Sequence, residues 1–311
     1  MEKGKVTLIG SYAAAIFLKS KTLPAVGETV RAQEFIESRG GKGSNQALTV
    51  SMLGCTSQFV ACIGNDRYGQ DALEMYRRYG VNTDMVKIDN EVPTGIGVIL
   101  IDEKGRNSIS NFLGANLRLM KKDIDAVLDY IKGSAIVGFQ LECELEMVDY
   151  GIRKIHSMGI CTLLDPAPAA SLSPDLYPYI DYIKPNEVEA TFLTGIEVKG
   201  VEDAKKAGVW FLEHGVGTAI ITLGEKGAVL VTSEMSRHFP SPDIKALDTT
   251  GAGDIFSGGF MAALSQGKNI EESVVFANHA AALSTKHLGV VESIPNLKEV
   301  EDFLGKSPLR I

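Results

Sequence analysis

Short apolar segments rich in β-branched residues alternate with amphipathic stretches from about residue 130 onward. The apolar segments read SAIVGF, CTLLD, DYIKP, GTAIITLG and KGAVLVTS, and one amphipathic stretch covers residues 144–158. This alternation predicts βα units that build a doubly wound α/β fold, a mostly parallel central sheet with helices on both faces. Ligands of such sheets bind at the carboxyl ends of the strands. We therefore expect functional residues in the turns that follow strands.

Two segments, roughly residues 27–38 and 94–112, depart from this rhythm. Both alternate apolar and polar residues as strands do, and DEKG within the second is a hairpin turn signal. We predict that the two segments form a small separate β-sheet, here called the lid, which the chain enters twice from the main body. A lid over a site, an ordinary edge sheet and a dimer contact all remain open as its role. The expected division is an α/β core of residues 1–11, 40–93 and 114–311 and a small β lid of residues 12–39 and 94–113.

Composition limits the partners of this chain. Its 311 residues, 45% of them hydrophobic, suffice for one large domain with a sizeable core. A formal net charge of -8 disfavours non-specific binding of nucleic acid or of an anionic membrane. Four cysteines without a Cys-x-x-Cys pair favour reduced thiols in a cytoplasm.

The first residues imitate a secretory signal, because two early lysines precede an apolar stretch and an Ala-x-Ala sequence. We prefer a buried first strand over residues 6–9, followed by a Gly-Ser turn. No apolar run reaches the about 18 residues that a membrane span needs. The expected protein is therefore cytoplasmic, without a membrane segment.

The stretch DTTGAGDIF, residues 248–256, places a glycine-rich turn at the start of a helical pattern. Glycines and the free N–H groups of a helix start can hold an anion. The helix dipole is expected to keep the pKa of Asp254 low and its carboxylate ionised. Such a carboxylate beside an anion site suits removal of a proton from a hydroxyl that attacks a phosphoryl group. Taken alone, the stretch also fits a helix N-cap after a tight connection.

Three further motifs sharpen this interpretation. GGKGSNQA, residues 40–47, offers Lys42 and Asn45 to hydroxyl groups. In KPNEVEA, Asn186 and Glu189 lie one helical turn apart, which suits a hydrated Mg²⁺ beside phosphates or, alternatively, a helix cap with an exposed acid. ITLGEKG offers backbone groups and the Thr222 hydroxyl to a nucleotide. Neither a P-loop sequence nor a dinucleotide fingerprint after the first strand is present, which argues against a nicotinamide enzyme.

GGKGSNQA, PNEVEA, ITLGEKG and DTTGAGDIFSGG, in this order and at these separations, resemble the motifs of the ribokinase-like, or PfkB, carbohydrate kinases along almost the whole chain. The resemblance implies an ATP-dependent sugar kinase that transfers the γ-phosphoryl group to a hydroxyl of a small sugar or sugar-like substrate. It implies that Asp254 is the general base, with an anion hole at Gly251, Ala252 and Gly253.

The resemblance also implies the remaining roles. Substrate contacts fall at Gly41, Lys42, Gly43, Asn45, Glu142 and Asp254. Contacts to ATP fall at Asn186, Glu189, Thr222, Gly224, Gly227, Gly253 and Asn278, with Mg²⁺ held by Glu189 through water. A monovalent cation, expected to be K⁺ as an activator, falls at Asp248, Thr250, Ser284, His287, Gly289 and Ser293. The lid suggests a homodimer in which two lids pair.

The chain departs from the family pattern after its first strand, where an Asn and an Asp, two residues apart, bind the sugar hydroxyls. Ala13 and Ala15 stand at these positions. Each lost hydrogen bond to a charged group removes about 1.5–3 kcal/mol. We therefore expect ribose to be a poor substrate and a deoxy sugar, a modified sugar or a nucleoside to be preferred. A non-catalytic sugar- or nucleotide-binding regulator is the alternative, although a pure binder has no use for Asp254.

Overall fold

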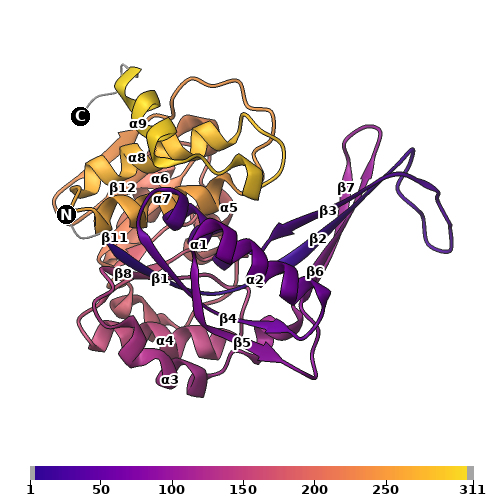
Figure 1. Cartoon of the computed structure of the whole chain (residues 1–311). Helices are drawn as coiled ribbons and strands as arrows, with labels where there is room; N and C mark the ends of the chain where they lie inside the picture. The colour runs from indigo at the N-terminus through magenta and orange to yellow at the C-terminus, as the bar shows by residue number, and fades with distance from the viewer. Residues whose placement is uncertain (1–3, 307–311) are drawn as a thin grey trace.

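The computed structural model of the chain describes residues 4–306. Within these residues, the main body is built on a nine-stranded sheet with the order β13-β12-β11-β10-β9-β8-β1-β4-β5 (Figure 1). The strands from β11 to β5 in this order run parallel, which confirms the predicted mostly parallel sheet. The strands are β1 Lys5–Ile9, β4 Thr56–Gly64, β5 Asn82–Asp89, β8 Ile136–Phe139, β9 Cys161–Leu164, β10 Tyr182–Ile183, β11 Thr218–Thr222, β12 Ala228–Val231 and β13 Ser236–Phe239.

Helices cover both faces of this sheet and divide the buried side chains into two cores. One core draws on α1, α2, α7, α8 and α9, and the other on α3, α4, α5 and α6. Successive side chains of a strand point to opposite faces, so Leu8 of β1 lies in the first core and Ile9 in the second. The helices are α1 Lys42–Met52, α2 Arg67–Tyr79, α3 Lys121–Ile131, α4 Leu145–Ser157, α5 Glu187–Thr194, α6 Val201–Glu213, α7 Ala252–Ser265, α8 Ile270–Ser284 and α9 Leu297–Lys306.

The strands after β11 differ from the predicted βα alternation. A single 3-10 turn, Gly224–Lys226, connects β11 to β12, and the two strands pair antiparallel. The N–H of Leu223 donates to the carbonyl of Gly227 at 2.7 Å, which closes a hairpin with no room for a helix. KGAVLVTS therefore contributes β12 as an antiparallel strand, which lies between β11 and the edge strand β13.

A separate four-stranded sheet, called the small sheet below, projects from the body in Figure 1. Its order is β3-β2-β6-β7, with β2 parallel to β6 and the outer pairs antiparallel. The hairpin turn predicted at DEKG joins β6 to β7. β2 lies within the predicted lid range of 12–39, although no strand was predicted at its position, and β3 begins later than the expected residue 27. The strands are β2 Ala13–Ser20, β3 Ala32–Gly40, β6 Gly95–Asp102 and β7 Asn107–Phe112.

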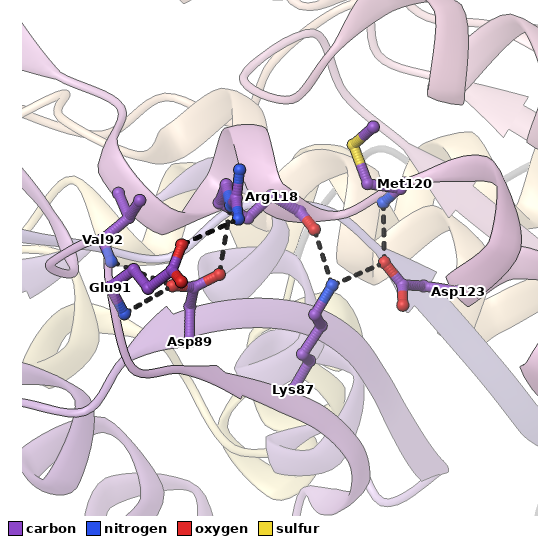
Figure 2. Close-up of polar contacts among 7 residues, drawn as sticks. All are labelled: Lys87, Asp89, Glu91, Val92, Arg118, Met120 and Asp123. Atoms are coloured by element: carbon purple, nitrogen blue, oxygen red, sulfur yellow. Dashed lines mark hydrogen bonds and ion pairs between the residues drawn. The ribbon is translucent and has the colours of Figure 1, made fainter.

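A cluster of charged side chains fastens the base of the small sheet to the body (Figure 2). Asp89, the last residue of β5, accepts hydrogen bonds from the N–H groups of Glu91 and Val92, both at 2.9 Å. Arg118 Nε lies 3.2 Å from Asp89 Oδ2, and Lys87 Nζ donates to the Arg118 carbonyl at 2.9 Å. The chain leading into β6 is therefore tied to the chain that leaves β7.

Asp66 adds a second attachment at the same place. It caps α2 by accepting from the N–H of Gly69 at 2.9 Å. It also accepts from the N–H and the hydroxyl of Thr94, at 2.8 and 2.7 Å. One carboxylate thus joins a helix of the body to Thr94, the residue just before β6.

Three expectations about the whole chain can be compared with the described residues. The predicted first strand is present as β1. None of the helices within residues 4–306 has the length and apolarity needed to span a membrane. All four cysteines are free thiols; three are buried and Cys161 is exposed.

Candidate active site

The turn before α7 has a shape that only glycine tolerates. Gly251 caps the helix with φ 78°, in the left-handed region. A Cβ at this position would lie 2.5 Å from Val290 Cγ1. Ala252 and Gly253 then form the first turn of α7 and line a pocket described below. The start of α7, where helical N–H groups lack partners within the helix, therefore faces a space that a ligand can enter.

Asp254 is the third residue of α7, and its side chain is only 6% exposed. Its Oδ2 accepts a hydrogen bond from Asn45 Nδ2 at 2.7 Å. Burial raises the pKa of Asp254 to about 6, opposed by the positive charge of Lys42. The expected low pKa is therefore wrong, because desolvation outweighs the stabilisation at the helix start. Asp254 is still mostly ionised at pH 7.

Several polar groups near Asp254 meet at the start of α1. Glu142 Oε2 accepts from the Lys42 N–H at 2.9 Å and from Ser11 Oγ at 2.5 Å. The charge of Asp254 raises the pKa of Lys42, so this ammonium stays protonated. The sequence predicted Lys42, Asn45 and Glu142 here, but it did not predict Ser11.

Close backbone packing explains the glycines of this motif. A Cβ at Gly41 would lie 2.6 Å from Tyr12 Cα, and a Cβ at Gly43 would lie 2.7 Å from the backbone nitrogen of Ser11. Glycine thus lets the start of α1 approach the chain just after β1. Ala13 and Ala15 follow as the first and third residues of β2, and both are half-buried.

A buried ion pair that the sequence analysis missed contacts the backbone of the glycine turn before α7. Lys184 Nζ lies 2.8 Å from Asp165 Oδ2 and donates to the Gly253 carbonyl at 3.3 Å. Asp165 Oδ2 also accepts from Gln46 Nε2 and Ser257 Oγ. Asp165 directly follows β9, and Lys184 directly follows β10. A charged residue at the end of an apolar strand is the sequence signal that could have identified both. They hold the backbone of Gly253 against the sheet.

A pocket of about 700 Å³ opens on the other side of α7. It brings together the predicted Thr222, Gly224, Gly227 and Asn278 with Gly253. Asn278 Nδ2 donates to the Phe239 carbonyl at 3.1 Å. Apolar groups line one part of it, among them Pro242, Ile244, Ala246, Phe256, Ala281 and Ala282. The mixture suits a flat heterocycle at one end and phosphates at the glycine turn.

Asn186 and Glu189 form a capping box at the start of α5. Asn186 Oδ1 accepts from the Glu189 N–H, and Glu189 Oε2 accepts from the Asn186 N–H, both at 2.9 Å. Glu189 is buried rather than exposed, and burial raises its pKa. Asn186 lines the pocket. A carboxylate with one oxygen engaged can still meet Mg²⁺ through water, because this ion keeps several waters in phosphate sites.

The six residues expected around a monovalent cation lie in and around two neighbouring loops. Asp248 accepts from the N–H groups of Thr250 and Gly289, at 2.9 and 3.1 Å. The Ser293 hydroxyl donates to the Val290 carbonyl, next to Gly289. Ser284 ends α8, and its carbonyl accepts from the His287 N–H at 3.2 Å. Asp248 thus joins the loop before α7 to the loop after α8.

The fold and these clusters define a class of protein, the carbohydrate kinases, and comparison with known proteins names the family. The family model of the pfkB family carbohydrate kinases matches residues 3–297. Ribokinase from Haemophilus influenzae is 35% identical over 96% of this chain and 98% of its own length. The deoxyribokinase of Salmonella typhimurium is 31% identical over 96% of this chain and 98% of its own length. The chain belongs to the pfkB family of carbohydrate kinases.

Solved structures agree in fold. Ribokinase from Thermotoga maritima has a TM-score of 0.88 and 38% identity, covering 97% of this chain and 99% of that one. Arabidopsis thaliana ribokinase, complexed with ribose and ATP, has a TM-score of 0.92 and 30% identity over 99% of this chain and all of that one.

Proposed function

We propose that this kinase transfers the γ-phosphoryl group of ATP to a hydroxyl of a small sugar or sugar-like substrate, with Asp254 as the general base. One observation carries the proposal. Asp254 is buried at a glycine turn, with the groups of α1 on one side and the large pocket on the other. An acceptor on the α1 side and a triphosphate in the pocket would meet at this carboxylate.

The pKa of about 6 suits the task of a base. A carboxylate with this pKa is mostly ionised at neutral pH and takes a proton more readily than an ordinary one. The N–H of Gly253, in the first turn of α7, would stabilise charge on the transferred phosphoryl group, whereas the N–H of Ala252 donates to the Thr249 carbonyl at 3.2 Å. Mg²⁺, held through Asn186 and Glu189, would neutralise phosphate charge. Closure of the small sheet as a lid over the acceptor would exclude water.

Neither Ala13 nor Ala15 offers a polar side chain to the acceptor. We therefore propose that ribose is a poor acceptor and that a deoxy sugar, a modified sugar or a nucleoside is preferred. The names of the relatives include both ribokinase and deoxyribokinase, which fits a family that varies at the acceptor. A binding regulator without turnover is the second candidate, favoured by the two alanines alone.

Two further features complete the proposal. K⁺ would bind at the loops joined by Asp248 and stiffen the turn that leads into α7. Two copies of the chain would pair through their small sheets as a homodimer.

The experiment is a measurement of ADP release from ATP with Mg²⁺ and K⁺ over a panel of pentoses, deoxy sugars, hexoses and nucleosides. Wild type should turn over one class of acceptor. Asp254→Asn should lose about 10²–10⁴-fold in kcat, the usual contribution of a general base. Asp302→Asn, an exposed acid on α9, is the matched control and should behave as wild type. Undiminished turnover in Asp254→Asn contradicts the role of this residue, and ATP binding without turnover favours the regulator.

A further inference from the structure

One face of the small sheet looks toward the proposed acceptor site. The ring of Tyr12 packs against Tyr76 of α2, with centroids 6.1 Å apart, whereas the neighbouring Ser11 hydroxyl reaches Glu142. Glu37, which pairs with Ile16 of β2, also contacts α2 through Tyr68. Side chains of an extended chain alternate between the two sides. Ala13 and Ala15 therefore share the side of Ser11 and Glu142.

The strand register extends this face across all four strands. Ala15 pairs with Ser38 of β3 and Gly97 of β6, and Gly97 pairs with Asn111 of β7. Paired residues present their side chains on the same face. The row nearer the body contains only small residues, Gly40, Ala13 and Gly95. The next row outward is apolar and contains Ile36, Phe17, Ile99 and Ile109.

The row of Ala15 therefore has a polar residue at each end, Ser38 and Asn111, and it lies between a row of small residues and a row of apolar residues. Asn111 is exposed, and its Oδ1 would lie 3.9 Å from a Cβ placed on Gly97, so the amide leans over this glycine. Among residues 4–306, neither the Asn111 amide nor the Ser38 hydroxyl has a hydrogen-bond partner. Both groups are free to bind a ligand that lies on this face.

Resting on the proposed function, we infer that Asn111, assisted by Ser38, is the specificity-determining polar group of this kinase. The acceptor that it selects is a pentose-sized sugar enlarged by a polar ring substituent, as in a nucleoside. Neighbouring strands lie about 4.8 Å apart, so Asn111 stands two strands, about 10 Å, from Ala15. A ring anchored beside Asp254 needs an added group to cross Ala15 and Gly97, and the small side chains leave space for it.

The test compares kcat/KM for ribose, 2-deoxyribose and the four common ribonucleosides. In wild type, one nucleoside should exceed both free sugars by at least about tenfold. Asn111→Ala and the near-isosteric Asn111→Leu should lower kcat/KM for this acceptor about three- to tenfold, mainly through KM, as expected for one neutral hydrogen bond. Turnover of the free sugars should change less than about twofold. Ser110→Ala, on the opposite face of β7, is the matched control and should not change any of these values.

Two results would overturn the inference while the proposed function stands. The first is a wild-type preference for ribose or 2-deoxyribose over every nucleoside. The second is an Asn111→Leu enzyme with unchanged kcat/KM for all acceptors. A wild-type enzyme that binds ATP but releases no ADP with any acceptor overturns the proposed function, and the inference falls with it. Circular dichroism of each variant confirms that the fold is retained.

Discussion

At the scale of single residues, Asp254 experiences two opposing influences. The helix start and the charge of Lys42 favour the ionised carboxylate, whereas burial favours the protonated form. Asp165 opposes ionisation as well, while Lys184 and the Asn45 amide support it. Burial is the largest of these effects and brings the pKa to about 6, close to neutral pH.

The first prediction concerns the pH profile of turnover. Because the base has to be ionised, kcat/KM should fall as the pH drops through about 6. Lys42→Met removes a positive charge that lowers the pKa of Asp254, so the acid limb should move upward by about one pH unit. Lys42→Arg keeps the charge and should leave the limb near the wild-type position. Steady-state kinetics between pH 5 and 8 measure the limb, and an unmoved limb in Lys42→Met contradicts the electrostatic argument.

The same burial predicts a gain in stability when the charge is removed. The pKa of Asp254 is higher in the folded chain than the ordinary 3.8, so the folded state keeps a proton that the unfolded state releases between pH 4 and 6. Ionisation at neutral pH therefore destabilises the fold. At 1.36 kcal/mol per pKa unit, Asp254→Asn should raise the free energy of unfolding by about 1–3 kcal/mol at pH 7.5.

Urea unfolding measures this difference, which should shrink as the pH falls from 6 to 4. Asp302→Asn is the control and should stay within about 0.5 kcal/mol of wild type at both ends of the range. A less stable Asp254→Asn protein at pH 7.5 is the opposite result and would show that the carboxylate is held favourably in its ionised form.

At the scale of secondary-structure elements, the attachment of the small sheet depends on a helix cap. Asp66 caps α2 and also holds Thr94, where the chain enters β6. Asn269 caps α8 with the same kind of hydrogen bond, to Glu272, but it has no contact with the small sheet. Comparing variants of the two caps therefore distinguishes an effect on helix stability from an effect on the position of the small sheet.

The prediction compares the two caps directly. Asp66→Ala and Asn269→Ala should each lower the free energy of unfolding by about 0.5–2 kcal/mol, the usual effect of a lost N-cap. Only Asp66→Ala should also raise KM for the acceptor, because it loosens the base of β6. Urea unfolding measures the free energy of unfolding of both variants, and steady-state kinetics measure their KM for the acceptor. Equal KM values in the two variants would show that Thr94 does not position the sheet.

At the scale of the whole molecule, the small sheet exposes large apolar side chains on both of its faces. Ile36 and Ile109 are 53% and 63% exposed on one face, and Phe35 and Phe112 are 60% and 52% exposed on the other. Exposed apolar strands of this kind associate unless they are covered. A second copy of the chain provides a matching surface.

We therefore predict a dimer in sedimentation experiments at micromolar concentration. The double variant Ile36→Lys, Ile109→Lys should sediment as a monomer, because association would bury its charges. Val209→Lys, an exposed apolar position on α6, is the control and should remain dimeric. A monomeric wild-type protein would contradict the prediction that two small sheets pair in a dimer.

Local pattern was enough to predict much of the fold. The βα alternation, the first strand and the DEKG turn depend on periodicity and turn residues that lie close together in the sequence. β2 escaped prediction because its strand form depends on pairing with β3 and β6 on either side. The antiparallel direction of β12 was not predicted, because it depends on the short turn Gly224–Lys226, which leaves no room for a crossover helix.

The sequence by itself determined which residues are available to the site: a glycine turn before an acid, a second glycine turn with Lys42 and Asn45, and two alanines after the first strand. Only the tertiary structure decided how these residues act. It brings Asn45 within 2.7 Å of Asp254 across 209 positions of sequence, and it pairs Lys184 with Asp165 below the turn. It also raises the pKa of Asp254, because desolvation depends on everything packed around a group and not on its neighbours in the chain.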